Sequence, residues 1–247
     1  MIDEKAFADA KARLLSLSEK QSGIGTLAEK SLHKILKLYY EPREEYHEIP
    51  FLSYVCDVKN ENGIIEIQTG SFTPLIHKLT RFLQETRVIV VYPIIAEKYL
   101  IWVNKETGEL TEPKKSPKKG KYSDALPQLS IISELLPCEN LTVRLVLLSA
   151  DEYKYLDGYG ESRKKRATKI EKLPRRIIDE FEIKEVNDIK KLLPPLENTF
   201  RSADFNKATG LKRRKAFFSL KFLERVGVIE KVGKDKNAFL YKLKDES

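Results

Sequence analysis

Four polar residues near position 60 have side chains that suit metal-ion chemistry: Asp57, Lys59, Glu66 and Gln68. Two carboxylates and an amide oxygen are ligands of the kind that Mg²⁺ prefers, and Mn²⁺ accepts the same donors. A cation held there would polarise a phosphodiester and lower the pKa of an attacking water. A nearby lysine would stabilise the charge that develops on the phosphate. These residue types therefore point to phosphate-ester hydrolysis, provided that the fold brings them together.

A predicted hairpin brings the four side chains to one place. Asn62-Gly63 is a strong hairpin signal and lies between two segments of strand composition. With this pair as the turn, Lys59 opposes Glu66 and Asp57 opposes Gln68. Because side chains alternate across a strand, all four then share one face of the sheet. The alternative is a plain cross-strand ion pair between Lys59 and Glu66 on a solvated face.

The surrounding chain predicts helices and further strands that would support this hairpin. Apolar residues recur at helical spacing in 4–18, 26–40 and 72–85. The predicted strands are 45–52, 53–59, 64–69, 87–92, 99–104 and 141–149. Residues 105–122 are polar and basic and predict a mobile loop, and 124–136 predict another helix.

The order of these elements around the two acids resembles the PD-(D/E)XK nuclease superfamily. Residues 24–104 carry the resemblance, with Asp57 on one strand and Glu66-Ile67-Gln68 on the next. It implies an α/β fold with a restriction-endonuclease-like αβββαβ core and a mixed central sheet. It also implies that Asp57 and Glu66 bind Mg²⁺ (or Mn²⁺), and that Glu29 on the preceding helix is an accessory ligand. The substrate would be DNA.

Two positions depart from the motif of that family. Cys56 precedes Asp57 where a proline is usual, although the family tolerates variation there. Gln68 replaces the usual lysine, and an amide neither acts as a base nor carries positive charge. Some members of the family have Gln at this place, and Lys59 or Lys30 would then supply the charge. A binding-only domain without catalysis is the alternative.

Other polar residues near this segment have weaker claims to a role. The three histidines form no metal-binding pair, and ordinary structural roles are expected for them. His77 is expected to lie nearest the site, because its helix directly follows the Gln68 strand. Ser71 and Thr73 at the start of that helix either cap it or contact a phosphate.

The C-terminal segment resembles the winged helix-turn-helix family. Its predicted elements are helices at 185–193, 202–209 and 212–226, a turn at Gly210-Leu211, and a hairpin of 228–232 with 238–243. The apolar core would be Phe205, Leu211, Phe217, Leu220, Leu223, Val226, Val228 and Ile229. The resemblance implies that the third helix enters the major groove of DNA and that the wing contacts the backbone. The contact residues would be Lys212, Arg213, Arg214, Lys215, Lys234 and Lys236. Protein docking is the alternative.

The charge of the chain is unevenly placed. The net charge is +8, and the residues from Gly158 to the end hold 24 Lys and Arg against 14 Asp and Glu. Such asymmetry favours a polyanionic partner. The basic run Arg163, Lys164, Lys165 and Arg166 would contact DNA or form a disordered linker. We expect a nuclease-like domain over 1–156, a basic linker over 157–176 and a winged-helix domain over 177–247.

Composition limits the class of protein. There is no run of about 18 apolar residues and no signal-peptide pattern, so we expect a cytoplasmic protein without a membrane partner. Two distant cysteines predict reduced thiols. The expected function is a restriction or genome-defence endonuclease, with a homodimer favoured if both strands are cut. The alternative is a non-catalytic DNA-binding transcriptional regulator.

Overall fold

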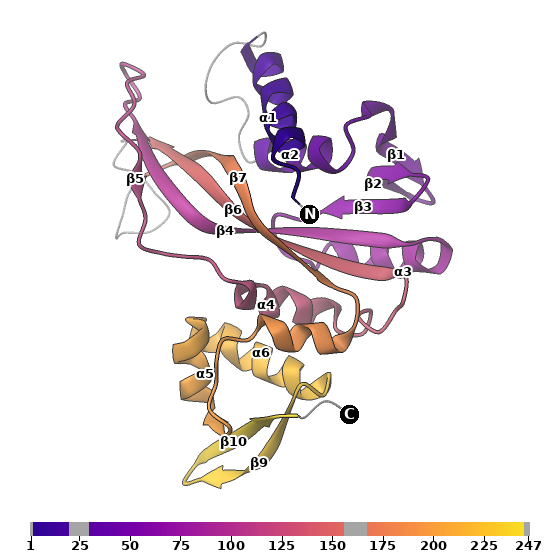
Figure 1. Ribbon diagram of the computed structural model, residues 1–247, viewed down its shortest axis with the longest axis vertical. Coiled ribbons are helices and arrows are strands. Elements are labelled where there is room, and N and C mark those ends of the chain that lie inside the picture. The colour runs from indigo at the N-terminus through magenta and orange to yellow at the C-terminus, as the bar shows by residue number, and fades with distance from the viewer. Residues whose placement is uncertain (1, 20–29, 156–166, 245–247) are drawn as a thin grey trace.

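Helices cover both faces of a central sheet in the computed structural model, which describes residues 2–19, 30–155 and 167–244 (Figure 1). The α-helices are α1 (Glu4–Glu19), α2 (Lys30–Tyr40), α3 (Leu75–Glu85), α4 (Leu126–Leu129), α5 (Ser202–Thr209) and α6 (Arg213–Arg225). The 3₁₀ helices are η1 (Glu44–Tyr46), η2 (Tyr122–Ala125), η3 (Ser130–Ile132) and η4 (Val186–Leu192). No helix of these residues is long and apolar enough to cross a membrane.

Within the described residues, the central sheet is mixed and has seven strands. They are β1 (His47–Phe51), β2 (Tyr54–Asn60), β3 (Gly63–Ile67), β4 (Val88–Val103), β5 (Lys114–Lys115), β6 (Leu141–Tyr155) and β7 (Lys169–Ile183). The spatial order is β1-β2-β3-β4-β6-β7, and β5 pairs with β4. The first three strands form an antiparallel meander, β3, β4 and β6 run parallel, and β7 is antiparallel to β6. The crossover from β3 to β4 contains α3.

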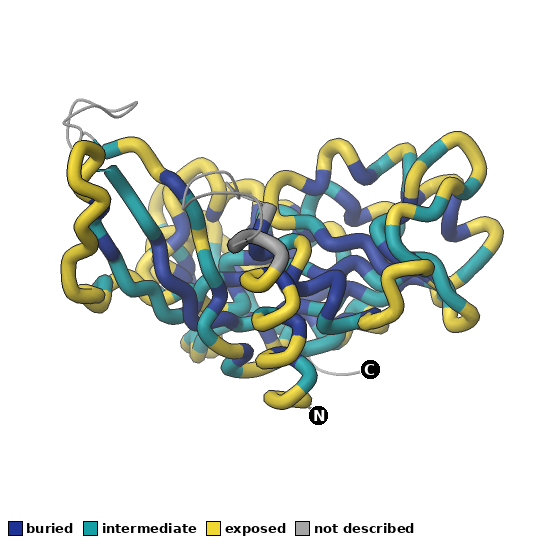
Figure 2. The backbone as a smooth tube through the Cα atoms, turned by 90° about the horizontal axis from the view of Figure 1, so that it is seen from above, coloured by how far each residue is buried: buried dark blue, intermediate teal, exposed yellow. Residues whose placement is uncertain are grey.

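Two hydrophobic layers hold the helices against the sheet. On one face, Ile35 and Leu36 of α2 pack with Val58, Ile65 and other strand residues, and α1 adds to the same cluster. On the other face, α3 and the η2–α4–η3 segment form a second cluster. The central strands are accordingly the buried part of the molecule, whereas the loops at the rim are exposed (Figure 2). Because α2 and α3 lie on opposite faces of the sheet, their side chains reach the β2–β3 hairpin from opposite sides.

The C-terminal part adds a small sheet and two helices. Strands β8 (Phe200–Arg201), β9 (Ile229–Asp235) and β10 (Ala238–Leu243) have the order β8-β10-β9. Between α5 and α6, Gly210 has φ 71°, a left-handed conformation that favours glycine and ends α5. Arg225 of α6 donates to Ser133 and Glu134 after α4. The hydrophobic cluster beneath the central sheet runs on into α5 and α6.

Several elements differ from the sequence-based expectation. The strands expected at 87–92 and 99–104 are one strand, β4, which contains Pro93. The β3 ladder ends at Val91, so the missing N–H of Pro93 costs no bond to β3. Residues 169–176 of the expected linker lie in β7 and pair with β6. Such pairing between distant segments leaves no local pattern.

Smaller differences have local causes. The helix expected over 124–136 is broken into η2, α4 and η3, and the helix expected over 185–193 is the 3₁₀ helix η4. The expected loop 105–122 contains β5. The prediction that Phe217 lies in the C-terminal core is wrong. Phe217 is 53% exposed, because α6 turns the face with Leu220 and Leu223 toward the core instead.

Candidate functional site

The β2–β3 hairpin sets the positions of the two acidic residues. Its turn residues are Glu61 and Asn62, and the strand pairs include Val58 with Ile65 and Asn60 with Gly63. The register expected from an Asn62-Gly63 turn is therefore wrong by two residues. The observed register, continued by one residue, would set Asp57 opposite Glu66, but the paired residues end at Val58 and Ile65.

Gly63 explains the change of register. Its φ is +124°, and a Cβ at this position would lie 2.4 Å from the backbone oxygen of Arg87. The glycine is therefore needed for close approach to the chain that enters β4, and the turn itself falls one residue earlier. Ile64 N also donates to Arg87 O at 2.9 Å, which fixes the start of β3.

Asp57 lies where β2 and β3 separate. Its Oδ2 accepts a hydrogen bond from the backbone N–H of Ile67 at 2.7 Å and contacts His33 Nε2 of α2 at 3.1 Å. Burial alone would raise the pKa of Asp57, but the hydrogen bond and charge of His33 and the Ile67 N–H lower it below its usual value. Asp57 is thus held as a carboxylate at neutral pH.

Glu66 is a buried acid beside it. The residue is 2% exposed, its Oε1 accepts from Asp57 N at 3.3 Å, and its Oε2 accepts from Lys78 Nζ at 2.6 Å. Burial and then the negative charge of Asp57 raise the pKa of Glu66 to about 7, against the opposing effect of Lys78. Two neighbouring acids with pKa values pushed apart are typical of functional sites.

Lys78 of α3 joins the two acids and was not among the residues singled out from the sequence. Its side chain is 16% exposed and paired with Glu66, and its charge also lowers the pKa of Asp57. The signal that could have found it is its place beside Leu75, Leu79 and Phe82 on the apolar face of α3. A lysine there must be paired when it is buried. It brings to the site the positive charge that Gln68 lacks.

The other expected site residues lie differently. Gln68 Nε2 donates to Ser71 O at 2.6 Å, so its amide organises the turn before α3. Lys59 opposes Ile64, and its ammonium lies 5.0 Å from the centre of the Phe51 ring. Glu29, Arg163, Lys164, Lys165 and Arg166 lie outside the described residues.

The expectation about the histidines is wrong in one respect. His77 is exposed, whereas His33 contacts Asp57. His47 Nε2 contacts the backbone oxygen of Glu41 at 2.7 Å and has a structural role in β1. His33 escaped notice because its helix precedes the hairpin by more than twenty residues, and only the packing of α2 on β2 joins them.

Two carboxylates, those of Asp57 and Glu66, bear on cation binding at this place. Among the described residues, no group of three or more His, Cys, Asp and Glu side chains could hold a metal ion. Mg²⁺, however, is often bound by one or two carboxylates, with water and substrate phosphate completing its shell. The negative charge of Asp57 contributes to the raised pKa of Glu66, and a cation between the acids would relieve that repulsion. Asp57 and Glu66 are the residues that would hold it.

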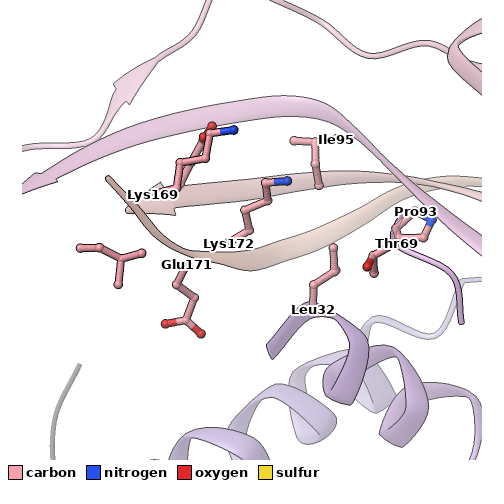
Figure 3. Close-up of a pocket in the computed structure, with 9 residues that line it drawn as sticks. Leu32, Thr69, Pro93, Ile95, Lys169, Glu171 and Lys172 are labelled. Atoms are coloured by element: carbon pink, nitrogen blue, oxygen red, sulfur yellow. The ribbon is translucent and has the colours of Figure 1, made fainter. Parts of the chain in front are cut away.

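A pocket of about 240 Å³ lies on the α2 side of the sheet (Figure 3). Its lining residues Leu32 and Thr69 are chain neighbours of His33 and Gln68. The β7 residues Lys169 and Lys172 line it as well. Glu152 and Glu171 also line it, so the pocket beside these chain neighbours carries acidic as well as cationic side chains.

The expected DNA-binding residues of the C-terminal part are all exposed: Lys212, Arg213, Arg214, Lys215, Lys234 and Lys236. The first four lie at the N-terminal end of α6, and the last two lie at the tip of the β9–β10 hairpin. Exposure of all six leaves them available to a polyanion.

Comparison with known proteins places the site within a family. A protein of Treponema pallidum (strain Nichols) with the name "Uncharacterized protein" is 29% identical over 222 residues, which cover 89% of this chain and 87% of the relative. No solved structure gives a significant match. The matched family region spans 30–184, which contains Asp57, Glu66 and Lys78 and ends after β7. The chain thus belongs to the family described as "Domain of unknown function (DUF8091)".

Proposed function

We propose that the protein is a Mg²⁺-dependent DNA endonuclease whose N-terminal part has a restriction-endonuclease-like core. The observation that carries the proposal is the juxtaposition of Asp57 and Glu66 with Lys78 on adjoining elements. The element order α2-β1-β2-β3-α3-β4, with an antiparallel meander and a parallel fourth strand, supports it. This is the αβββαβ order that the sequence resemblance implied.

Each residue then has a distinct role. Asp57 and Glu66 bind the cation, which when bound supplies Lewis-acid activation of the phosphate and of a water. Lys78 stabilises negative charge on the phosphate and lowers the pKa of Glu66 against the effect of burial. His33 orients Asp57 through its Nε2 contact at 3.1 Å. Gln68 holds the β3–α3 turn and takes no part in proton transfer.

The C-terminal part would recruit DNA. The succession α5, α6, β9 and β10 agrees with a winged helix-turn-helix, in which α6 meets DNA and the hairpin is the wing. The exposed cations at the start of α6 and at the hairpin tip favour contacts with phosphates.

Cleavage of DNA tests the proposal. The purified protein should nick or linearise supercoiled DNA in millimolar Mg²⁺, and EDTA should abolish the reaction. Asp57→Ala should lose the activity, whereas Asp9→Ala, which removes an exposed acid of α1, should keep it. Full cleavage by Asp57→Ala would refute the assignment of the site.

A second candidate is a DNA-binding regulator without catalysis. The Glu66–Lys78 ion pair favours it, because this pair already neutralises the buried carboxylate without a metal. A regulator would bind DNA equally well with and without Mg²⁺, and would leave the DNA intact. Cleavage in the assay above would exclude it.

A further inference from the structure

The outward face of α6 carries two aromatic side chains. Phe217 is 53% exposed and Phe218 is 46% exposed, and their ring centres lie 5.7 Å apart in an edge-to-face arrangement. The opposite face of the helix is fully used by the core, with Leu220 and Leu223 buried. Grouped apolar side chains on a surface are unfavourable in water and mark a binding site.

Cations surround the two rings. Lys221 Nζ lies 4.8 Å from the centre of the Phe217 ring, and the Arg214 guanidinium lies 5.9 Å from that of Phe218. At about 100° per residue, Arg213 also falls on this outward face. Lys221 and Arg214 come between the two phenylalanines around the helix. The surface is therefore both aromatic and basic.

The same combination recurs on the wing. Phe239 of β10 is 44% exposed, with Lys231 Nζ at 4.9 Å and Lys234 Nζ at 5.0 Å from its ring centre. Two separate elements of the C-terminal part thus pair exposed aromatic rings with cations. A partner that contacts both elements would meet aromatic rings and cations on each.

The positive charge of the outward face of α6 indicates the chemical class of its partner. A second copy of the chain would bring Arg213, Arg214 and Lys221 against their own counterparts, and such like-charge contact opposes association. A polyanion with flat apolar faces suits the surface, because phosphates pair with the cations and bases stack on the rings. Phenylalanine has no polar atom for reading base edges, and in a closed duplex the base faces are covered by their neighbours.

We propose that the outward face of α6 binds unpaired bases of a DNA strand by stacking on Phe217 and Phe218. The proposal rests on the proposed function in that it takes the C-terminal part to bind DNA. It adds the substrate class: single-stranded DNA, or duplex DNA with an unpaired segment. Binding by this face does not depend on cleavage at Asp57 and Glu66.

Binding measurements on matched probes test it. The full chain is titrated in EDTA against a single-stranded oligonucleotide, an abasic strand of equal length and charge, and the corresponding duplex. The double variant F217A/F218A is compared with wild type and with Leu110→Ala, which removes an exposed apolar side chain outside the C-terminal part. F217L/F218L keeps apolar bulk without an aromatic face and guards against misfolding.

The expected result is selective. Wild type should bind the single strand more tightly than the abasic strand, and F217A/F218A should lose about 10- to 100-fold for the single strand. F217L/F218L should lose most of that affinity, and Leu110→Ala should lose none. Affinity of F217A/F218A for the abasic strand and the duplex should stay at the wild-type value.

Three results would overturn it. Equal wild-type affinity for the abasic and normal strands would exclude stacking. An equal loss on duplex and single strand in the double variant would mean that the rings contact closed DNA. Binding only to an acidic protein or to anionic lipid, and to none of the three probes, would exclude nucleic acid as the partner. If the protein binds the single strand more tightly than the abasic strand but does not cleave DNA, the proposed nuclease activity is refuted and the proposed stacking is not.

Discussion

At the scale of single residues, Lys78 distinguishes a catalytic site from a buried ion pair. Lys78→Met should lower kcat for DNA cleavage by about 100-fold or more, because the charge that stabilises the phosphate is lost. Lys59→Met is the matched control, since its ammonium lies over Phe51, and it should keep kcat near the wild-type value. Rates at saturating DNA give the comparison.

Stability must be measured with the rates. Removing one partner of a buried ion pair costs about 3–5 kcal/mol, so Lys78→Met should also lower the denaturant midpoint. Lys78→Arg keeps the charge and should recover both stability and part of kcat. An unchanged kcat in Lys78→Met, whatever its denaturant midpoint, would contradict a catalytic role.

The pKa of Glu66 predicts a pH dependence. It is about 7 in the folded chain against 4.5 as the ordinary value, so the fold binds this proton more tightly than the unfolded chain. Ionisation of Glu66 therefore costs folding stability as the pH rises from about 4.5 to about 7, and the cost is complete above pH 7. Without metal, Glu66→Gln should remove this loss, which is about 3 kcal/mol. Urea denaturation at pH 5 and pH 8 measures it.

At the scale of elements, the β2–β3 hairpin depends on Gly63. Gly63→Ala should destabilise the protein by about 2–4 kcal/mol, because its φ of +124° is strained for alanine and the Cβ meets Arg87 O. Gly108→Ala is the matched control, with φ +75° and open space around its Cβ, and it should cost about 1 kcal/mol. Chemical denaturation compares them. Equal losses of stability in the two variants would mean that the close approach of Gly63 to Arg87 O does not contribute to stability.

Local pattern predicted much of the element order and one half of the site. Alternating strands and a hairpin signal predicted that Asp57 and Glu66 share a face. In the structure the Asp57 carboxylate contacts His33 of α2, whereas the Glu66 carboxylate contacts Lys78 of α3, and the two acids meet through the Asp57 N–H, which donates to Glu66 Oε1. The exact turn could not be predicted, because the need for glycine at position 63 comes from Arg87, more than twenty residues away. His33 and Lys78 reach the acids from helices on opposite faces of the sheet. Only tertiary packing brings them there, and no spacing in the sequence encodes it.

At the scale of the whole molecule, one hydrophobic cluster joins the central sheet to the C-terminal part. We therefore predict one cooperative unfolding transition. Trp102 in β4 is the single tryptophan, so its fluorescence reports on the sheet. Leu223→Ala in α6 should lower the free energy of unfolding by about 2–5 kcal/mol. The midpoint of the fluorescence transition should fall accordingly. An unshifted fluorescence transition, with earlier loss of helical signal, would show that the two parts unfold separately.

The central claim is that Asp57 and Glu66 together bind one divalent cation. Calorimetric titration of the metal-free protein with Mn²⁺ and Mg²⁺ at pH 8 tests it most directly, with Asp57→Asn, Glu66→Gln and the surface variant Asp9→Asn measured in parallel. We expect one site in the wild type and in Asp9→Asn, and no measurable binding in the other two variants. Wild-type binding that persists unchanged in both Asp57→Asn and Glu66→Gln, or no binding in the wild type, would contradict the account.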